Sequence, residues 1–135
     1  MKRAHRWILS VSAVLIAAAI FSGCSPTPPA TLELTGKDSG SHQTLAVGQK
    51  LAVSLESNPT TGYRWALDGA LPPVLRREGE PAYTSSSSLP GAGGTEVWTF
   101  VGVSAGSGTL KLKYWRSFEP TATPPQSFEV SVDVK

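Results

Sequence analysis

Hydrophobic and polar residues alternate with a period of two over much of the chain. Leu51, Val53 and Leu55 are separated by small or polar residues, and the same spacing recurs near the end of the sequence. Successive side chains of a β-strand point to opposite faces, so this alternation predicts strands with one buried face. The pattern locates six such strands, at residues 32–34, 51–55, 63–67, 96–103, 109–115 and 128–134.

Glycine and proline interrupt the chain too often for long helices. They form pairs at Pro72-Pro73, Pro90-Gly91, Gly93-Gly94 and Pro124-Pro125, and no segment after residue 30 has sustained helical periodicity. About seven or eight short strands in roughly 100 residues, separated by turn signals, are typical of an immunoglobulin-like β-sandwich. We therefore expect an all-β fold of this kind, with Trp65 in its core.

The first residues have the composition of a secretory signal peptide. Lys2, Arg3 and Arg6 form a basic start, and an apolar stretch of 15 residues follows at 7–21. This stretch is shorter than the roughly 20 apolar residues that span a bilayer as a helix. We therefore favour cleavage over a retained transmembrane anchor.

The sequence Phe21-Ser22-Gly23-Cys24 resembles a bacterial lipobox. This resemblance implies removal of residues 1–23 as a lipoprotein signal peptide and lipidation of the Cys24 thiol. Residues 24–30 contain three prolines and no apolar run, so we expect a flexible tether. The sequence thus predicts an exported lipoprotein that is anchored to a membrane and faces the extracytoplasmic side.

Processing at this point changes the composition of what remains. Cys24 is the only cysteine, so the domain at residues 31–135 must be stabilised by packing rather than by a disulfide. A mature chain of 112 residues suffices for one domain, which we expect to be monomeric. Lys+Arg falls from 12 to 9 against an Asp+Glu of 10, which gives a net charge of −1. The remaining basic residues are scattered, which argues against a nucleic-acid partner.

The mature sequence offers little for catalysis. His42 is its only histidine, and a lone histidine near a strand start is usually a solvated surface residue. Glu78 and Glu80 lie in a polar stretch that favours solubility rather than acid–base chemistry. The sequence also lacks a Gly-x-Ser-x-Gly elbow and the spacing of metal ligands. We therefore expect no enzymatic activity, metal or cofactor.

One segment between two predicted strands combines unusual constraints. In Asn58-Pro59-Thr60-Thr61-Gly62-Tyr63, the proline fixes its own φ and the glycine can adopt the positive φ of a tight turn. Taken alone, the segment is consistent with a well-formed turn and nothing more.

Two further irregular segments accompany it, at residues 85–94 and 115–126. In the sandwich the three would form the B-C, D-E and F-G connections, and these loops can share one end of the molecule. The serine run at 85–88 predicts that the second loop is disordered until it binds. Arg116 and Phe118 have side chains typical of an interface anchor.

Together these segments make a family recognisable. The chain resembles the chagasin-like inhibitors of cysteine peptidases, whose pattern is an Asn-Pro-Thr-Thr-Gly-Tyr loop, a Gly-x-Gly-Gly loop and an Arg-Pro-Trp-type loop. The first motif is complete at residues 58–63, and the second is present at residues 91–94. The third departs from the pattern, because Ser117 and Phe118 replace the usual proline and tryptophan. The similarity covers residues 31–135.

The resemblance implies an immunoglobulin-like domain that inserts three loops into the active-site cleft of papain-like cysteine peptidases. Inhibition would be reversible and without a covalent bond to the catalytic cysteine. The alternative is an immunoglobulin-like lipoprotein that binds another surface or matrix ligand. The residues expected to contact the peptidase are Asn58, Pro59, Thr60, Thr61, Gly62, Tyr63, Gly91, Ala92, Gly93, Gly94, Arg116 and Phe118.

Overall fold

The computed structural model describes residues 27, 29–119 and 123–135. Within this part the chain forms nine strands and two short 3-10 helices, and no α-helix. The elements are β1 (Leu32–Thr35), η1 (Gly36–Asp38), β2 (His42–Leu45), β3 (Lys50–Ser57), η2 (Pro59–Thr61), β4 (Arg64–Leu67), β5 (Leu75–Arg77), β6 (Ala82–Ser85), β7 (Gly94–Gly102), β8 (Gly106–Trp115) and β9 (Gln126–Val134).

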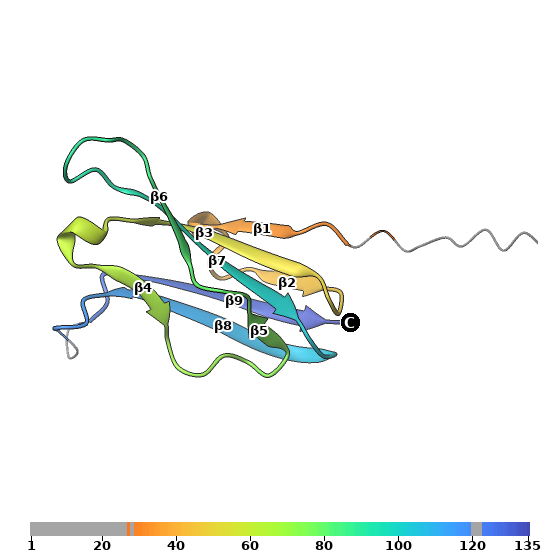
Figure 1. Ribbon diagram of the computed structural model, residues 1–135. Coiled ribbons are helices and arrows are strands. Elements are labelled where there is room, and N and C mark those ends of the chain that lie inside the picture. The colour runs from red at the N-terminus through yellow and green to blue at the C-terminus, as the bar shows by residue number, and fades with distance from the viewer. Residues whose placement is uncertain (1–26, 28, 120–122) are drawn as a thin grey trace, which may run out of the picture.

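The strands form two sheets that pack face to face (Figure 1). One sheet has the order β1-β3-β7-β5, with β6 also pairing with β7, and the other has the order β2-β9-β8-β4. Most pairs are antiparallel, but β1 runs parallel to β3 and β2 runs parallel to β9. The chain therefore changes sheets between β1 and β2, where η1 crosses the open side of the sandwich.

Alternating side chains from the two sheets fill the core. Leu51, Val53 and Leu55 on β3 face inward and are at most 2% exposed. Phe100 on β7 and Phe128 on β9 are among the largest fully buried side chains, and they contribute to the same cluster. The expectation that Trp65 belongs to the core is confirmed. The architecture is the predicted all-β, immunoglobulin-like sandwich.

All six strands located by alternation are present. The structure adds three strands that alternation does not locate, β2, β5 and β6, for a total of nine instead of seven or eight. Each has only three or four residues, and all four side chains of β6 are exposed. A strand this short does not repeat its pattern often enough to be recognised from the sequence.

The ends of the sandwich differ in what they present. In Figure 1 the β3–β4, β6–β7 and β8–β9 connections lie at one end, and the C-terminus and the start of β1 lie at the other. The predicted signal peptide and the lipidation site at Cys24 fall outside the described residues. Among the residues that are described, none belongs to a helix long and apolar enough to cross a membrane.

Candidate functional site

The first loop joins β3 to β4 as a single 3-10 turn. Asn58 precedes the turn with a φ of −135° and a ψ of 86°, and Pro59 is the first residue of the turn. Gly62 ends it in the left-handed conformation, with φ of 83°, and donates its N–H to Pro59 O at 3.0 Å. The positive φ expected of this glycine is therefore confirmed. A proline start and a glycine end make the loop rigid before it contacts anything.

Hydrogen bonds within this loop occupy most of its polar groups. Thr61 Oγ1 donates to Asn58 O at 2.7 Å, and Thr60 Oγ1 donates to Asn58 Oδ1 at 2.5 Å. The N–H of Asn58 donates to the Tyr114 hydroxyl on β8 at 2.7 Å. These side chains therefore hold the loop in shape and attach its start to the opposite sheet.

The second loop is a hairpin between β6 and β7 that lies beside the first. Asn58 Nδ2 donates to Gly91 O at 3.2 Å, which joins the two loops. A side chain on Gly94 would collide with the backbone of Thr84, so only glycine allows the hairpin strands to approach this closely. Ser86 bonds Gly93 O through both its N–H and its hydroxyl, at 2.9 and 2.6 Å. These bonds join the two sides of the loop near its base, and disorder of the loop before binding stays a prediction.

The third loop follows β8 and is attached to the first through Arg116. The Arg116 Nε donates to Thr61 O at 3.1 Å, and its guanidinium lies 4.2 Å from the centre of the Tyr63 ring. Glu119 accepts a hydrogen bond from Arg116 Nη1 at 3.3 Å. Arg116 therefore connects two loops as well as offering charge to a partner.

Phe118 is the apolar group that this loop presents. Its side chain is 68% exposed, and it lies against Gly62, where a Cβ atom would come within 3.0 Å of the phenyl ring. Tyr63 differs from it: the ring is partly buried, packs against the core and stacks on Tyr114 at 5.2 Å. Phe118 is thus available to a partner, whereas Tyr63 mainly supports the loops from below.

A hollow of about 710 Å³ lies between the three loops. Asn58 and Thr61 line it from the first loop, Gly93 from the second and Arg116 from the third. The predicted residues of all three motifs therefore gather at one end of the sandwich.

A buried carboxylate lies beneath this end. Glu96 on β7 is only 2% exposed, accepts a hydrogen bond from the Ser57 hydroxyl at 3.0 Å and another from Trp98 Nε1 at 3.0 Å. Because Ser57 directly precedes Asn58, this network fixes the point where the first loop leaves β3. Glu96 holds an inward position in the alternating series of β7, but alternation alone does not predict a buried carboxylate.

Leu89 is a second residue that the sequence analysis left out of the site. It lies at the tip of the β6–β7 hairpin and is 72% exposed, slightly more than Phe118 at 68%. A lone leucine within a stretch of serine, proline and glycine was the available signal. An exposed apolar side chain at the tip of a loop is a typical interface feature.

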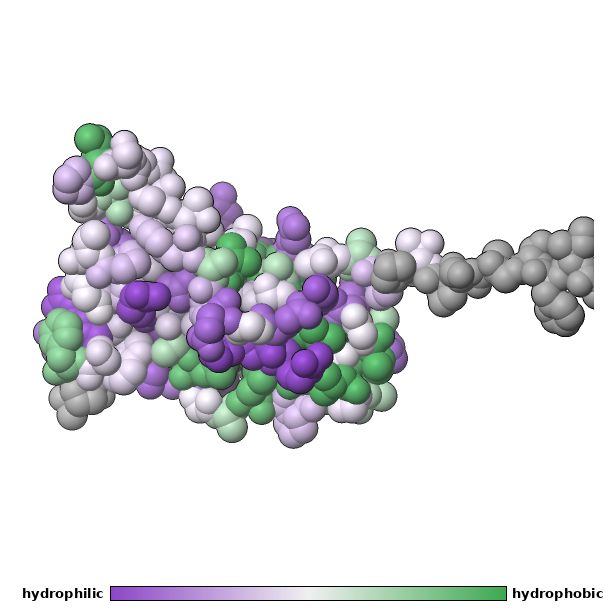
Figure 2. Space-filling model, viewed as in Figure 1, coloured by the Kyte–Doolittle hydropathy of each residue, from purple (hydrophilic) through white to green (hydrophobic). Residues whose placement is uncertain are grey.

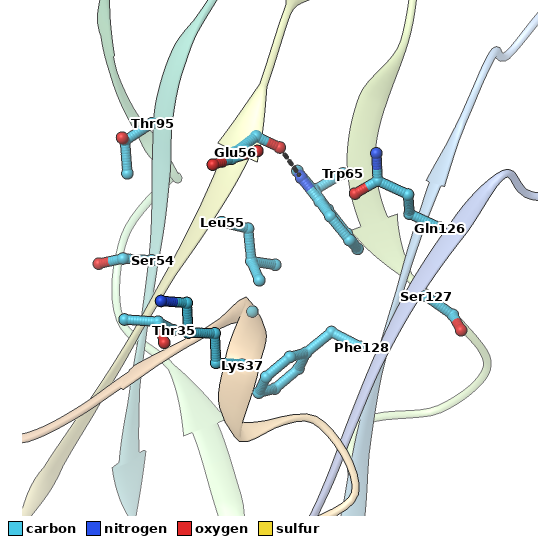
Figure 3. Close-up of a pocket in the computed structure, with 11 residues that line it drawn as sticks. Thr35, Lys37, Ser54, Leu55, Glu56, Trp65, Thr95, Gln126, Ser127 and Phe128 are labelled. Carbon is cyan, nitrogen blue, oxygen red and sulfur yellow. Dashed lines mark hydrogen bonds between the residues drawn. The ribbon is translucent and has the colours of Figure 1, made fainter. Parts of the chain in front are cut away.

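A second hollow, of about 520 Å³, lies on the open side of the sandwich below the loops (Figure 3). Leu55 and Phe128 point into it from opposite sheets, and Trp65 Nε1 donates to Glu56 O at 2.9 Å. Glu56 also lines the hollow between the loops, so the two hollows adjoin. The tryptophan N–H is thus already satisfied.

His42 has the exposed position that the sequence predicts. Its Nε2 lies 2.9 Å from Asp133 Oδ2, and Ser107 Oγ donates to Asp133 Oδ1 at 2.6 Å. The hydrogen bond from Ser107, and then the contact with His42, hold the pKa of Asp133 below its usual value. Ser107 bonds the carboxylate and not the imidazole, so the arrangement does not activate a nucleophile. The described residues contain no cluster of potential metal ligands.

Comparison with known proteins assigns a family. Residues 44–132 match the model of the chagasin family peptidase inhibitor I42. Chagasin from Trypanosoma cruzi is 30% identical over 105 residues, which are 73% of this chain and 93% of chagasin.

Two solved structures have the same fold. The crystal structure of the cysteine protease inhibitor EhICP2 from Entamoeba histolytica has a TM-score of 0.69 and 22% identity, covering 78% of this chain and 96% of that one. PbICP-C in complex with falcipain-2 has a TM-score of 0.52 and 24% identity, covering 78% of this chain and 91% of that one. At these identities the likeness concerns the fold.

Proposed function

The chain belongs to the chagasin family of cysteine peptidase inhibitors, and from this premise we propose that it occludes the active-site cleft of papain-like peptidases with its three loops. Binding is reversible and forms no covalent bond. PbICP-C, which shares the fold, was solved in complex with falcipain-2, and this supports a peptidase as the partner. The inhibitor itself performs no catalysis.

The observation that carries this proposal is the attachment of the loops to one another. Asn58 bonds the second loop and Arg116 bonds the first, so the three loops form one connected edge. A preformed edge loses little conformational entropy on docking, and this raises affinity. Such an edge can enter a cleft as a unit.

The chemistry of the edge suits a narrow, polar cleft. Gly91 and Gly93 have no side chains, so backbone there can approach a cleft wall and exchange main-chain hydrogen bonds. Leu89 and Phe118 supply exposed apolar surface on either side of the first loop. Apolar groups that flank a polar, rigid centre are typical of stable interfaces.

The same rigidity protects the inhibitor from cleavage. A peptidase cuts a bond only when its thiolate meets the carbonyl carbon with attack geometry, and proximity without alignment gives little rate. The 3-10 turn at Pro59–Thr61 is closed by backbone hydrogen bonds from Thr61 to Asn58 and from Gly62 to Pro59, at 3.1 and 3.0 Å. An extended conformation suitable for attack would require both bonds to open.

Titration of the domain into papain tests the proposal. We expect activity against a fluorogenic peptide to fall in near-stoichiometric proportion and to return after the complex is diluted, because no covalent bond forms. The intact inhibitor should be recovered by mass spectrometry. Full papain activity at micromolar excess, repeated with other papain-family enzymes, would contradict the proposal and favour the alternative of a different ligand.

The proposal extends to the location of the protein. The basic start, the apolar stretch and the Ser-Gly-Cys ending support export, cleavage before Cys24 and anchoring through a lipid on its thiol. We expect a Cys24→Ser variant expressed in bacteria to lose its lipid and leave the membrane fraction. Its inhibition of papain should be unchanged. A wild-type protein without a lipid by mass spectrometry would refute the anchor while leaving the inhibitor proposal intact.

A further inference from the structure

At the end of the sandwich opposite the loops, backbone hydrogen bonds connect three segments of the chain. Gly48 N–H donates to Gly102 O at 2.7 Å, which links the β2–β3 turn to the β7–β8 turn. Val103 N–H donates to Val74 O at 2.9 Å, which adds the segment before β5. We call this surface, formed by residues 46–49, 72–75 and 102–108, the tether pole. It is one continuous surface.

The tether pole exposes apolar side chains and has charged residues at its border. None of its three segments contains an acidic or basic residue. Asp133 accepts a hydrogen bond from Ser107 Oγ at 2.6 Å and Lys135 O accepts the N–H of Val47 at 3.0 Å, so both charged residues lie beside the pole. Val47 is 51% exposed and Val103 is 41% exposed, and Pro73 is exposed beside them. In Figure 2 green, hydrophobic surface extends along the lower right of the domain, towards the end where the C-terminus lies in Figure 1. Ion pairs lie on other faces of the domain, for example Lys111 with Glu129, and at the border of the pole, where Lys50 pairs with Glu78 at 2.8 Å.

The chain that leads to the predicted anchor is attached to this same pole. Gln49 Nε2 donates to Ala30 O at 2.7 Å, while Gln49 Oε1 accepts the N–H of Ala46 at 2.9 Å. Ala30 is the last residue of the predicted tether. Ala30 is therefore held against the turn that presents Val47, at the end of the domain opposite the loops.

We propose that the tether pole rests on the lipid surface to which the protein is anchored, with Val47 and Val103 in contact with the membrane interface. This inference rests on the lipid anchor at Cys24 proposed above. Residues 24–30 reach at most about 25 Å when fully extended, so the pole cannot move far from the lipid. A contact held at such high local concentration needs little affinity of its own.

The orientation has a consequence for inhibition. Strand β8 has 10 residues and runs from the tether pole to the third loop. At about 3.3 Å per residue, this separates the loops from the lipid-facing pole by roughly 30 Å. The three loops thus point away from the membrane, towards peptidases in the surrounding medium.

Site-specific fluorescence on the lipidated full chain tests this orientation. Cys24 is the only cysteine and its thiol carries the lipid, so Val47→Cys and Val103→Cys each introduce one labelling site. Each variant receives an environment-sensitive dye and is reconstituted into vesicles of phosphatidylethanolamine with a minor fraction of phosphatidylglycerol. Leu89→Cys, at the opposite end, is the matched control because it is equally a single exposed apolar residue.

We expect a blue shift at positions 47 and 103 when vesicles are present, and loss of emission when spin-labelled lipid is included. The dye at position 89 should do neither. The protein could float with the vesicles while the dyes at positions 47 and 103 keep the emission wavelength that they have in water. This result would contradict the orientation but not the lipid anchor. A change that follows protein density rather than spin-labelled lipid would overturn it in favour of contact between two copies.

A failed anchor gives a different result. Unaltered protein would then label at Cys24 and would not float with vesicles, which overturns the anchor and the orientation together. The double variant Val47→Asp, Val103→Asp, with the dye on Ala105→Cys, provides an independent check. We expect it to lose the quenching by spin-labelled lipid that the Ala105→Cys parent displays, while its inhibition of papain in solution is unchanged.

Discussion

Gly62 has a backbone conformation that favours glycine and a close contact with Phe118, and substitutions can test the two separately. Its φ of 83° is strained for any other residue, and its α-carbon faces the Phe118 ring. Gly69, between β4 and β5, has nearly the same φ of 84°, but nothing lies within 4 Å of the position of a Cβ atom there. The two glycines therefore share the backbone requirement and differ in the contact.

Gly62→Ala should lower both stability and inhibition. The left-handed conformation costs a non-glycine residue about 1–2 kcal/mol, and the new methyl group would displace Phe118. Gly69→Ala should cost similar stability and leave inhibition unchanged. Thermal unfolding and papain inhibition constants of both variants measure this. Equal inhibition constants for the two variants would show that inhibition does not depend on the position of the Phe118 ring.

Arg116→Ala should weaken inhibition by about tenfold, which corresponds to about 1.4 kcal/mol. The variant loses the hydrogen bond to Thr61 O and the stacking on Tyr63, so the third loop is no longer attached to the first. Loss of preorganisation should appear mainly as faster dissociation. Stopped-flow or surface-based kinetics would measure it, with Arg76→Ala, an exposed arginine on β5, as the control. An unchanged dissociation rate would contradict this role.

The short helix η1 lies between β1 and β2, which belong to different sheets. Its last residue, Asp38, holds it to β1 through hydrogen bonds. Asp38 Oδ2 accepts hydrogen bonds from the N–H of Thr35 at 2.7 Å and from its hydroxyl at 3.0 Å. These bonds, the backbone one first, hold the pKa of Asp38 below its usual value of 3.8. The bonds favour the ionised form, so they stabilise the fold only while Asp38 is charged.

The pH dependence follows from this sign. Because the folded pKa is depressed, the contribution of Asp38 is present above the unfolded pKa of 3.8 and is lost as the pH falls through the folded pKa. Asp38→Asn should therefore melt at a lower temperature than the parent at pH 7, and the difference should shrink under strong acid. Glu33→Gln, on the neighbouring β1, should have little effect. A difference that is constant with pH would contradict the assignment.

The molecule as a whole is held together by its apolar core. The domain at residues 31–135 contains no cysteine, so core packing takes the place of disulfides. Phe100 is fully buried between the sheets, whereas Phe118 is 68% exposed at the loop end. Substitution by alanine at each of these two positions should therefore affect stability at one and binding at the other.

Phe100→Ala should destabilise the fold by about 3–5 kcal/mol, since it removes a buried ring and leaves a cavity. That loss is a large part of the roughly 5–15 kcal/mol available to a typical domain. Phe118→Ala should leave the melting temperature unchanged and weaken inhibition. Chemical denaturation and papain titration test the pair. A large loss of stability in the Phe118 variant would place that ring in the fold rather than at the interface.

The sequence by itself determined the fold class, most of the strands and the identity of the loops. Alternation depends on the pleat of a single strand, and the turn at residues 58–63 depends on the local constraints of Pro59 and Gly62. These features are local in the chain, so they can be recognised without coordinates. The strands that the sequence did not predict are short. One of them, β6, is exposed and is held by pairing with β7 rather than by an alternating pattern of its own.

Only the tertiary structure decided how the loops are connected and what supports them. Arg116 and Thr61 are 55 residues apart in sequence, and Asn58 and Gly91 are 33 residues apart. Their contacts depend on the register of strands in both sheets, which no local pattern specifies. The burial of Glu96 likewise follows from the packing of the sheets. Long-range packing therefore turned three recognisable loops into one rigid edge.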